Sequence, residues 1–219
     1  MYPATQQWSR PIADELWLLS HNEQSGRAKL DEQRVALGIA GAIICELLID
    51  GLVTIAGEQH VFLRYDPRYG RDEIAQWALT EMDRADGQVP VSQWIWHLCG
   101  ESTLRVADRL SQAGAIEYVK SGLLGGNRRA VPANSNVAAT PRVRILHQLA
   151  TGQVDVGTLT LGALAVAIDL DTIISRDAVA PGLREDLVFA AKEYLHQHLR
   201  DVANAVRGAA TQANMTIRR

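Results

Sequence analysis

The chain has few cysteines and no long apolar run, and these shortages exclude several classes of protein. Its 219 residues include two cysteines, Cys45 and Cys99, too few for a disulfide framework. The longest apolar run, residues 36–49, contains Glu46 and is shorter than the roughly 20 residues that a membrane-spanning helix needs. The N-terminus lacks a basic region followed by an apolar stretch, so we expect no secretory signal. We therefore expect a cytoplasmic globular protein with buried free thiols.

Excess charge of either sign is also missing, but the positive charge is unevenly distributed. The chain has 22 Lys and Arg against 25 Asp and Glu, a net charge of −3, so a general attraction to nucleic acid or anionic lipid is excluded. No acidic residue occurs between Glu117 and Asp155. This basic segment contains Lys120, Arg128, Arg129, Arg142 and Arg144. Any attraction to an anionic partner is therefore expected to be local.

The hydrophobic pattern predicts one mainly α-helical domain with small β-hairpins. We expect a first helix after Pro11, and further helices over residues 33–49, 72–83, 91–98, 102–114, 142–150, 156–168 and 183–208. Short apolar runs predict one hairpin from residues 52–55 and 60–63, and a second from residues 115–119 and 129–131. Because two expected helices precede the second hairpin, we expect it to project from a winged helix-like unit. Residues 134–140 are expected to be a loop.

The expected boundaries give a short extension at each end of this domain. Residues 1–11 are an N-terminal extension, residues 12–208 the domain, and residues 209–219 a C-terminal tail. We find no internal repeat and no linker that would divide the domain.

No motif points to catalysis or to a metal. His97 and Cys99 are two residues apart, so on a helix they point in different directions and form no dyad. Glu193 and His196 share a helical face, but two ligands do not make a metal site. The glycine-rich segment 122–126 lacks the Lys-Ser/Thr ending of a phosphate-binding loop. We therefore expect neither an enzyme nor a cofactor or metal.

The turn of the second hairpin supports two interpretations. Leu123 and Leu124 stand at its tip, close to Arg128 and Arg129, as in a surface that enters an anionic membrane. Each basic residue near such a surface contributes about 1 kcal/mol, and each buried leucine about 1.5–3 kcal/mol. In the alternative, the leucines pack inward or against a second copy, and the hairpin is a protein-interaction or oligomerisation module. The sequence leaves both open.

DNA binding is not expected, although a winged helix with basic residues is a common DNA-binding unit. The candidate recognition helix carries Arg105 and Arg109 but also Glu101 and Asp108. It lacks the cluster of Asn, Gln, Lys and Arg that reads bases and phosphates.

Five groups of short motifs follow one another along residues 12–207. They are ADELWLL at 13–19 with GR at 26–27 and LD at 30–31; LGIAGA at 37–42 with EL at 46–47 and DGL at 50–52; DP at 66–67 with Gly70 and DE at 72–73; WI at 94–95 with Leu98, Arg105, Leu110 and GAI at 114–116; and the pattern of the last helices. In order and spacing they resemble the Golgi phosphoprotein 3 family, in particular its bacterial, actinobacterial-type members. The resemblance implies a single mainly helical domain with a projecting hairpin, peripheral membrane binding through phosphatidylinositol 4-phosphate, and in some members self-association through the hairpin.

The lipid pocket that the resemblance implies is only partly present in this sequence. Asp31 stands where the family has a tryptophan, and Ile39 and Ala40 replace the arginine between its small residues. Gly100 and Thr103 stand where two further arginines are expected. Because arginine supplies paired donors to phosphate, these replacements predict weaker binding of the 4-phosphate and leave room for another anionic lipid.

The sequence thus predicts a cytoplasmic, non-enzymatic, peripheral membrane protein that binds an anionic phospholipid, by resemblance phosphatidylinositol 4-phosphate. The alternative is an interaction or homo-oligomerisation module without specific lipid binding. The expected headgroup-binding residues are Arg105, Lys120, Arg128, Arg129, Arg142 and Arg144, and the residues expected to insert or oligomerise are Leu123 and Leu124.

Overall fold

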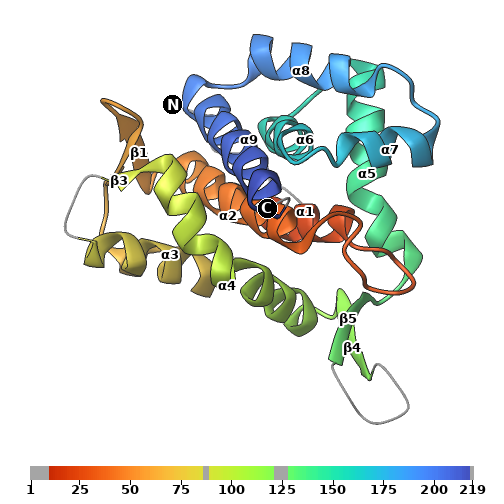
Figure 1. Ribbon diagram of the computed structural model, residues 1–219, viewed down its shortest axis with the longest axis horizontal. Helices are drawn as coiled ribbons and strands as arrows, with labels where there is room; N and C mark the ends of the chain where they lie inside the picture. Colours follow the sequence, from red (N-terminus) through yellow and green to blue (C-terminus); the bar gives the residue numbers. More distant parts are fainter. Residues whose placement is uncertain (1–9, 86–88, 121–127, 218–219) are drawn as a thin grey trace.

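The structure, a computed structural model, describes residues 10–85, 89–120 and 128–217, and it is mainly helical (Figure 1). The helices are α1 (Ile12–Ser20), α2 (Glu32–Ile49), α3 (Glu73–Arg84), α4 (Val91–Gln112), α5 (Ser135–Thr151), α6 (Val156–Ala167), α7 (Asp171–Ala178), α8 (Leu183–Tyr194) and α9 (Gln197–Ile217). The strands are β1 (Val53–Ala56), β2 (His60–Leu63), β3 (Val89–Pro90), β4 (Ile116–Lys120) and β5 (Arg128–Pro132), and Pro67–Tyr69 form a short 3-10 helix. The expected fold class, mainly α with small hairpins, is confirmed.

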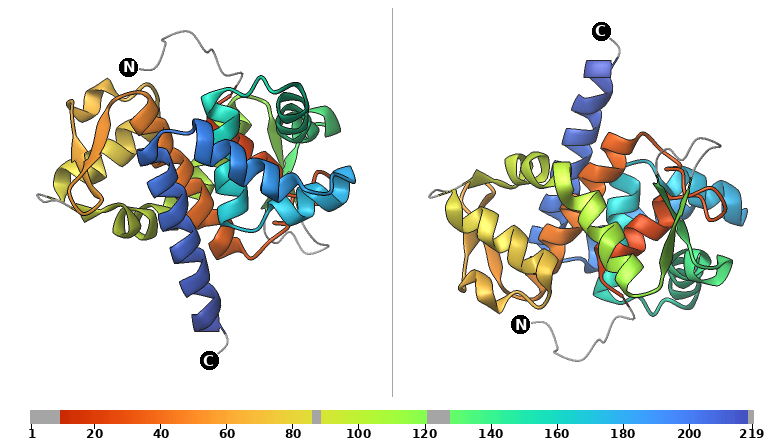
Figure 2. Two further views of the ribbon diagram at one scale, coloured as in Figure 1. Left: turned by 90° about the horizontal axis from the view of Figure 1, so that it is seen from above. Right: turned by 90° about the horizontal axis from the view of Figure 1, so that it is seen from below.

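Helix α2 lies at the centre of the core, as its all-round apolar sequence predicts. It packs against α1, α4, α6 and α9, and both cysteines are buried and unpaired. Gly41 allows a close approach to α9, because a Cβ there would lie 2.3 Å from Cγ2 of Val206. Figure 2 shows α9 crossing the body and projecting its C-terminal end beyond it. The small residues of α2 therefore determine how closely the two helices pack.

Both predicted hairpins are present, on different sides of the helices. Strands β1 and β2 pair antiparallel, and β3 adds to β2 to make a three-stranded sheet. Strands β4 and β5 form a separate two-stranded ladder in which Tyr118 faces Ala130 and Val119 faces Arg129. This second hairpin projects from the end of α4, at the lower right of Figure 1.

The expected winged helix-like unit is wrong, because the two helices predicted before the second hairpin are one. Helix α4 runs without a break through 22 residues. Ser102, where the second helix is expected to begin, instead donates its hydroxyl hydrogen within the core, with the carbonyl oxygens of Ala36 and Cys99 at 3.3 and 3.4 Å. Because backbone carbonyl oxygens already accept the hydrogen bond of this buried hydroxyl, Ser102 does not act as the N-cap of a new helix.

The loop expected at residues 134–140 is helical. Asn134 caps α5 by accepting a hydrogen bond from the Val137 N–H at 3.0 Å. The helix then continues through Pro141, a residue whose missing N–H usually ends a helix. Pro141 is buried, so packing outweighs the lost hydrogen bond.

The C-terminal third also differs from expectation. Helix α7 was not predicted, and the helix expected over residues 183–208 is two helices, because Leu195 has an extended backbone (φ −86°, ψ 136°). Helix α9 continues to Ile217, so most of the expected tail belongs to the domain. Ala209, Ala210 and Ala213 of that segment are buried in the core.

Carboxylates from the first three motif groups meet in a buried network with two arginines. Arg109 contacts Asp14 (Nε to Oδ1, 2.9 Å) and Asp72 (NH1 to Oδ2, 2.7 Å). Arg71 contacts Glu46 (NH2 to Oε2, 2.7 Å), which also accepts a hydrogen bond from the α1 backbone. Burial raises the pKa of Glu46 to about 7. The network joins α1, α2, α3 and α4, so these motif residues have a structural role.

No single helix in the described part of the chain is long and apolar enough to cross a membrane. Helices α5 and α6 meet the criteria of length and composition only together, and they are bent by 111° at their junction.

Candidate functional site

A large open cavity lies between the α1–α2 loop, the second half of α4 and the β4–β5 hairpin. Its volume is about 940 Å³. Its walls are formed by Trp17, His21, residues 26–28, residues 30–33, Val35, Ala36, Cys99, Gly100, Thr103, Leu104, Ala107, Tyr118 and residues 128–130. Three elements distant in sequence therefore contribute to one space.

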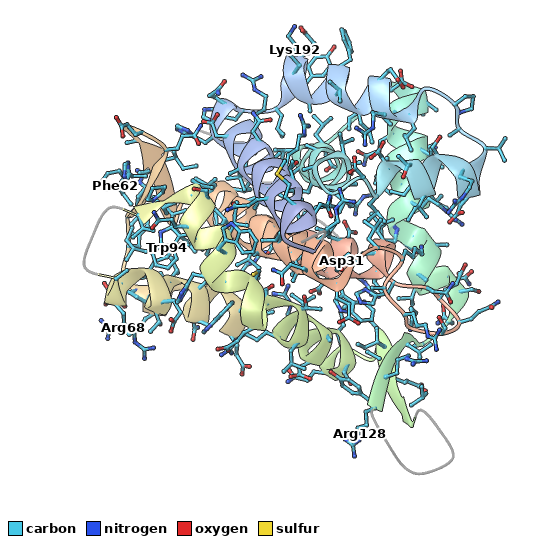
Figure 3. All side chains as sticks on the ribbon, viewed as in Figure 1. Asp31, Phe62, Arg68, Trp94, Arg128 and Lys192 are labelled. Carbon is cyan, nitrogen blue, oxygen red and sulfur yellow. The ribbon has the colours of Figure 1, made fainter. Side chains whose placement is uncertain are left out.

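The cationic residues that line the cavity are Arg27 of the α1–α2 loop and Arg128 and Arg129 of β5. Figure 3 labels Arg128 at the hairpin, away from the helical body. Within residues 10–85, 89–120 and 128–217, none of these three guanidinium groups forms an ion pair with a carboxylate. Their charge is therefore available to an anionic ligand.

The backbone holds the loop directly against the hairpin. Gly26 has a left-handed backbone (φ +62°), and a Cβ on it would lie 1.9 Å from the carbonyl oxygen of Ala130. On the other side, the Tyr118 hydroxyl donates to Oδ1 of Asp108 on α4 at 2.7 Å. These contacts fix the hairpin relative to Arg27 and to α4.

An aromatic pair forms the floor of the cavity. Trp17 and His21 stack with their ring centres 3.9 Å apart and their planes 12° apart, and both are buried. Burial lowers the pKa of His21 to about 4, so the ring is neutral at pH 7 and donates through Nδ1 to the Trp17 carbonyl oxygen at 2.8 Å. The floor thus adds no positive charge at neutral pH.

Two side-chain polar atoms of the lining residues are buried and have no partner. Among the described residues, Nε1 of Trp17 and Oγ1 of Thr103 form no hydrogen bond. Unpaired buried donors are rare, because each costs about 1–3 kcal/mol. Both atoms are shielded from solvent, so a ligand in the open cavity does not reach them without a local rearrangement.

Three of the positions that the resemblance assigns to lipid binding do line this cavity. They are Asp31, Gly100 and Thr103, and none of them carries a positive charge. Asp31 instead caps α2, accepting hydrogen bonds from the N–H groups of Gln33 and Arg34 at 3.0 and 3.3 Å. Ala40 is buried in α2 and does not line the cavity. These three positions therefore share one cavity, and the positive charge that lines it comes from other residues.

The structure separates the expected headgroup-binding residues into two groups. Arg128 and Arg129 line the cavity, and Lys120 lies opposite Arg128 in the hairpin ladder. Leu123 and Leu124 lie outside the residues that the structure describes.

The second group lies elsewhere. Arg105 contacts Glu101 (NH2 to Oε2, 2.7 Å) and lies over the Trp77 ring, 4.4 Å from its centre. Arg144 forms a paired contact with the buried Glu15 carboxylate. Neither of these arginines, nor the half-buried Arg142, lines the cavity.

Sequence reasoning did not select Arg27, Trp17 or His21 as site residues. Arg27 and Trp17 belong to motifs that carried the resemblance, and that was the available signal. For metals, no group of three or more His, Cys, Asp or Glu side chains in the described ranges could hold an ion.

Comparison with protein families gave one match. The sequence model of the family described as Golgi phosphoprotein 3 (GPP34) matches residues 12–213, nearly the whole chain. Comparison with curated proteins gave no match.

Proposed function

Because this chain belongs to the Golgi phosphoprotein 3 family, we propose that it is a peripheral membrane protein that binds the headgroup of an anionic phospholipid in the cavity beside the β4–β5 hairpin. One observation carries the proposal: Arg27, Arg128 and Arg129 line the same cavity, and none of them forms an ion pair with a described carboxylate, although Asp31 and Glu32 also line the cavity. Guanidinium groups bind phosphate oxygens through paired N–H donors, so this set suits a phosphate.

The proposed preference is for anionic lipids in general over phosphatidylinositol 4-phosphate in particular. The cavity positions Asp31, Gly100 and Thr103 supply no cation, and the Asp31 carboxylate repels a second phosphate charge. A phosphomonoester therefore gains little over the phosphodiester that every anionic phospholipid carries.

The hairpin tip remains a prediction from sequence. Lys120, Leu123 and Leu124 are proposed to contact the bilayer while the arginines hold the headgroup. Such contact would place the cavity at the membrane surface, where each nearby basic residue contributes about 1 kcal/mol.

Liposome co-sedimentation at low and high salt tests the proposal. The vesicles are phosphatidylcholine alone, or with phosphatidylglycerol, phosphatidylinositol or phosphatidylinositol 4-phosphate. We expect binding to all three anionic mixtures, decreasing with salt because surface charge is screened over about 8–10 Å. Equal binding to neutral and anionic vesicles would overturn the proposal.

Single arginine variants locate the site. Arg27→Ala and Arg129→Ala are each expected to weaken binding about fivefold, corresponding to about 1 kcal/mol. Arg176→Ala is the matched control, because Arg176 is an exposed arginine of α7 outside the cavity. Equal losses in all three variants would indicate general charge attraction instead of a site.

Light scattering with Leu124→Asp separates membrane contact from self-association. The proposal expects this variant to lose membrane binding at unchanged oligomeric state. A broken oligomer with unchanged lipid binding would instead make the hairpin a protein interface.

A further inference from the structure

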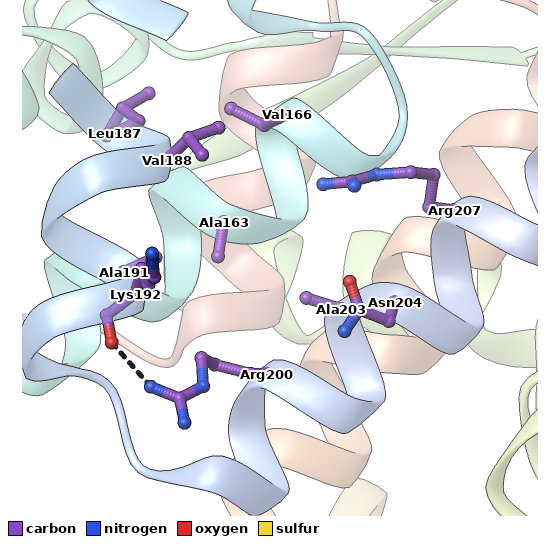
Figure 4. A pocket seen from close by; sticks show the side chains of 10 residues that line it. All are labelled: Ala163, Val166, Leu187, Val188, Ala191, Lys192, Arg200, Ala203, Asn204 and Arg207. Carbon is purple, nitrogen blue, oxygen red and sulfur yellow. Dashed lines mark hydrogen bonds between the residues drawn. The ribbon is translucent and has the colours of Figure 1, made fainter. Parts of the chain in front are cut away.

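A small groove lies between α6, α8 and the first half of α9, at the end of the molecule opposite the hairpin. Figure 1 shows α8 at the top and β4–β5 at the bottom, and Figure 4 shows the groove from close by. Its volume is about 160 Å³. None of its lining residues belongs to the cavity described above.

The floor of the groove is apolar and is kept open by small side chains. Ala163 of α6 and Ala203 of α9 lie opposite Leu187 of α8, and all three are buried. Val188 lies at the edge and is 47% exposed, a large exposed fraction for an aliphatic side chain. The exposed apolar surface and the hollow beside it form one continuous contact area.

The rim of the groove is cationic. Lys192, Arg200 and Arg207 line it, and among the residues that the structure describes no acidic side chain does. NH1 of Arg200 donates to the Lys192 carbonyl oxygen at 2.6 Å, and NH2 donates to Oε1 of Gln197 at 2.6 Å. These bonds orient the guanidinium without neutralising it, since neither acceptor is charged.

The charge on the rim is uncompensated in the described part of the chain. None of Lys192, Arg200 and Arg207 forms an ion pair there. Arginines elsewhere in the helices do have carboxylate partners, as Arg34 has Asp169 and Arg144 has Glu15.

We propose that this groove binds an acidic amphipathic helical segment of a partner protein, which places one large apolar side chain between two carboxylates. A space of this size holds about one aromatic or leucine side chain, as a cavity of about 150 Å³ holds benzene. It is too small for a lipid acyl chain. Charge complementarity with the rim requires that the partner be acidic.

The spacing of the rim arginines indicates the pattern of the partner. Arg200 and Arg207 are seven residues apart on α9, which is two turns or about 10 Å along the helix. Two glutamates seven positions apart on a facing helix have the same spacing, and a leucine midway between them lies on the same side. The apolar floor would receive this leucine.

The test adds each of two synthetic helical peptides to the whole protein. Binding is measured from changes in the amide NMR signals of the protein, a method that detects millimolar binding. The first carries two glutamates seven positions apart with one leucine midway. The second has lysines in place of the glutamates. We expect the first peptide alone to shift the signals of residues around the groove, Val188 and Ala203 among them, with affinity that decreases with salt.

Two surface variants and two matched controls locate the binding. Arg207→Glu and Val188→Asp are each expected to weaken binding of the acidic peptide about fivefold or more, equivalent to 1 kcal/mol or more. Both residues are exposed, so both variants should fold. Arg176→Glu and Val179→Asp are the controls, since both residues are exposed on or beside α7 and outside the groove.

Three results would overturn the proposal. The first is equal binding of the acidic and basic peptides, and the second is equal losses in the groove variants and their controls. The third is that phosphatidylcholine–phosphatidylglycerol vesicles displace the acidic peptide from the unmodified chain and that Arg207→Glu abolishes vesicle binding at the groove. That result would mean that the groove binds a membrane. Lipid binding through the hairpin cavity is measured separately with Arg129→Ala, so either proposal can fail alone.

Discussion

Gly26 lies so close to Ala130 that a single added carbon would lie 1.9 Å from the Ala130 carbonyl oxygen. The loop that carries Arg27 and the strand that carries Arg129 therefore touch through their backbones. Because of this contact, arginines about a hundred positions apart face one cavity.

Replacing this glycine is expected to disturb both stability and lipid binding. A residue with a Cβ pays roughly 1–2 kcal/mol to adopt a left-handed backbone. Gly26→Ala should lower the free energy of unfolding by more than this, because the Ala130 carbonyl must also move. Gly152→Ala is the matched control: Gly152 has a similar φ of +69° with nothing within 4 Å of its Cβ position. Chemical denaturation and liposome binding of both variants test this. Equal effects would mean that the contact with Ala130 is unimportant.

Arg144 is expected to act on stability and not on lipid. Its partner Glu15 is only 1% exposed, and breaking a buried pair typically costs about 3–5 kcal/mol. Arg144→Ala should therefore lose stability of that order, while the folded fraction binds vesicles as the unmodified chain does. Adding Glu15→Gln should restore part of the loss, since the unpaired charge is removed. A loss of lipid binding at unchanged stability would return Arg144 to the headgroup site.

Arg105 of α4 is expected to stabilise the contact between α4 and α3 at the surface and not to bind lipid. Arg105→Ala removes the contact with Glu101 and the cation–π contact with Trp77, together worth about 1 kcal/mol. Thermal unfolding should show this small loss, and vesicle binding should remain unchanged. A loss of binding as large as that of Arg129→Ala would contradict the placement of the site.

Glu46 is expected to make stability depend on pH. Its pKa is about 7 in the folded chain against 4.5 for an ordinary glutamate, so the folded state binds the proton more tightly. The stabilisation from this group is complete below about pH 4.5 and is lost as the pH rises through about 7. Between pH 5 and 8 the unmodified chain should lose about 2–3 kcal/mol relative to Glu46→Gln.

The comparison with Glu46→Gln isolates this effect from His21. Burial lowers the pKa of His21 to about 4, so its contribution has the opposite sign and is lost as the pH falls from 6.5 to 4. His21 is present in both proteins and cancels in the difference. Parallel stability curves for the two proteins would show that Arg71 keeps Glu46 ionised throughout.

Local signals were sufficient for much of the fold. Helix α2 has an acidic cap at Asp31 and an unbroken apolar surface, and the β1–β2 turn has Gly57 next to Glu58, so both were predicted within a residue or two. Ser102 is a residue type that often caps a helix, so the sequence predicts a break within α4 that the structure does not have. Burial against α2 outweighed this local signal, and burial depends on contacts that local sequence does not contain.

The site was harder to predict for the same reason. Sequence shows which arginines lack acidic neighbours along the chain, and by that criterion Arg144 and Arg129 are equivalent. In space Arg144 meets Glu15, 129 positions away, while Arg129 meets no described carboxylate. Arg27 lines the cavity only because the β4–β5 hairpin, about a hundred residues later in the chain, packs beside the α1–α2 loop. Ion pairing across the fold therefore decides which positive charges are free.

The unbroken α4 has a mechanical consequence. At 22 residues it is a rod about 33 Å long, with the β4–β5 hairpin at one end and β3 of the three-stranded sheet at the other. A continuous helix is stiff, so the two ends cannot turn independently. A tilt imposed on the hairpin would therefore be transmitted through α4 to the three-stranded sheet.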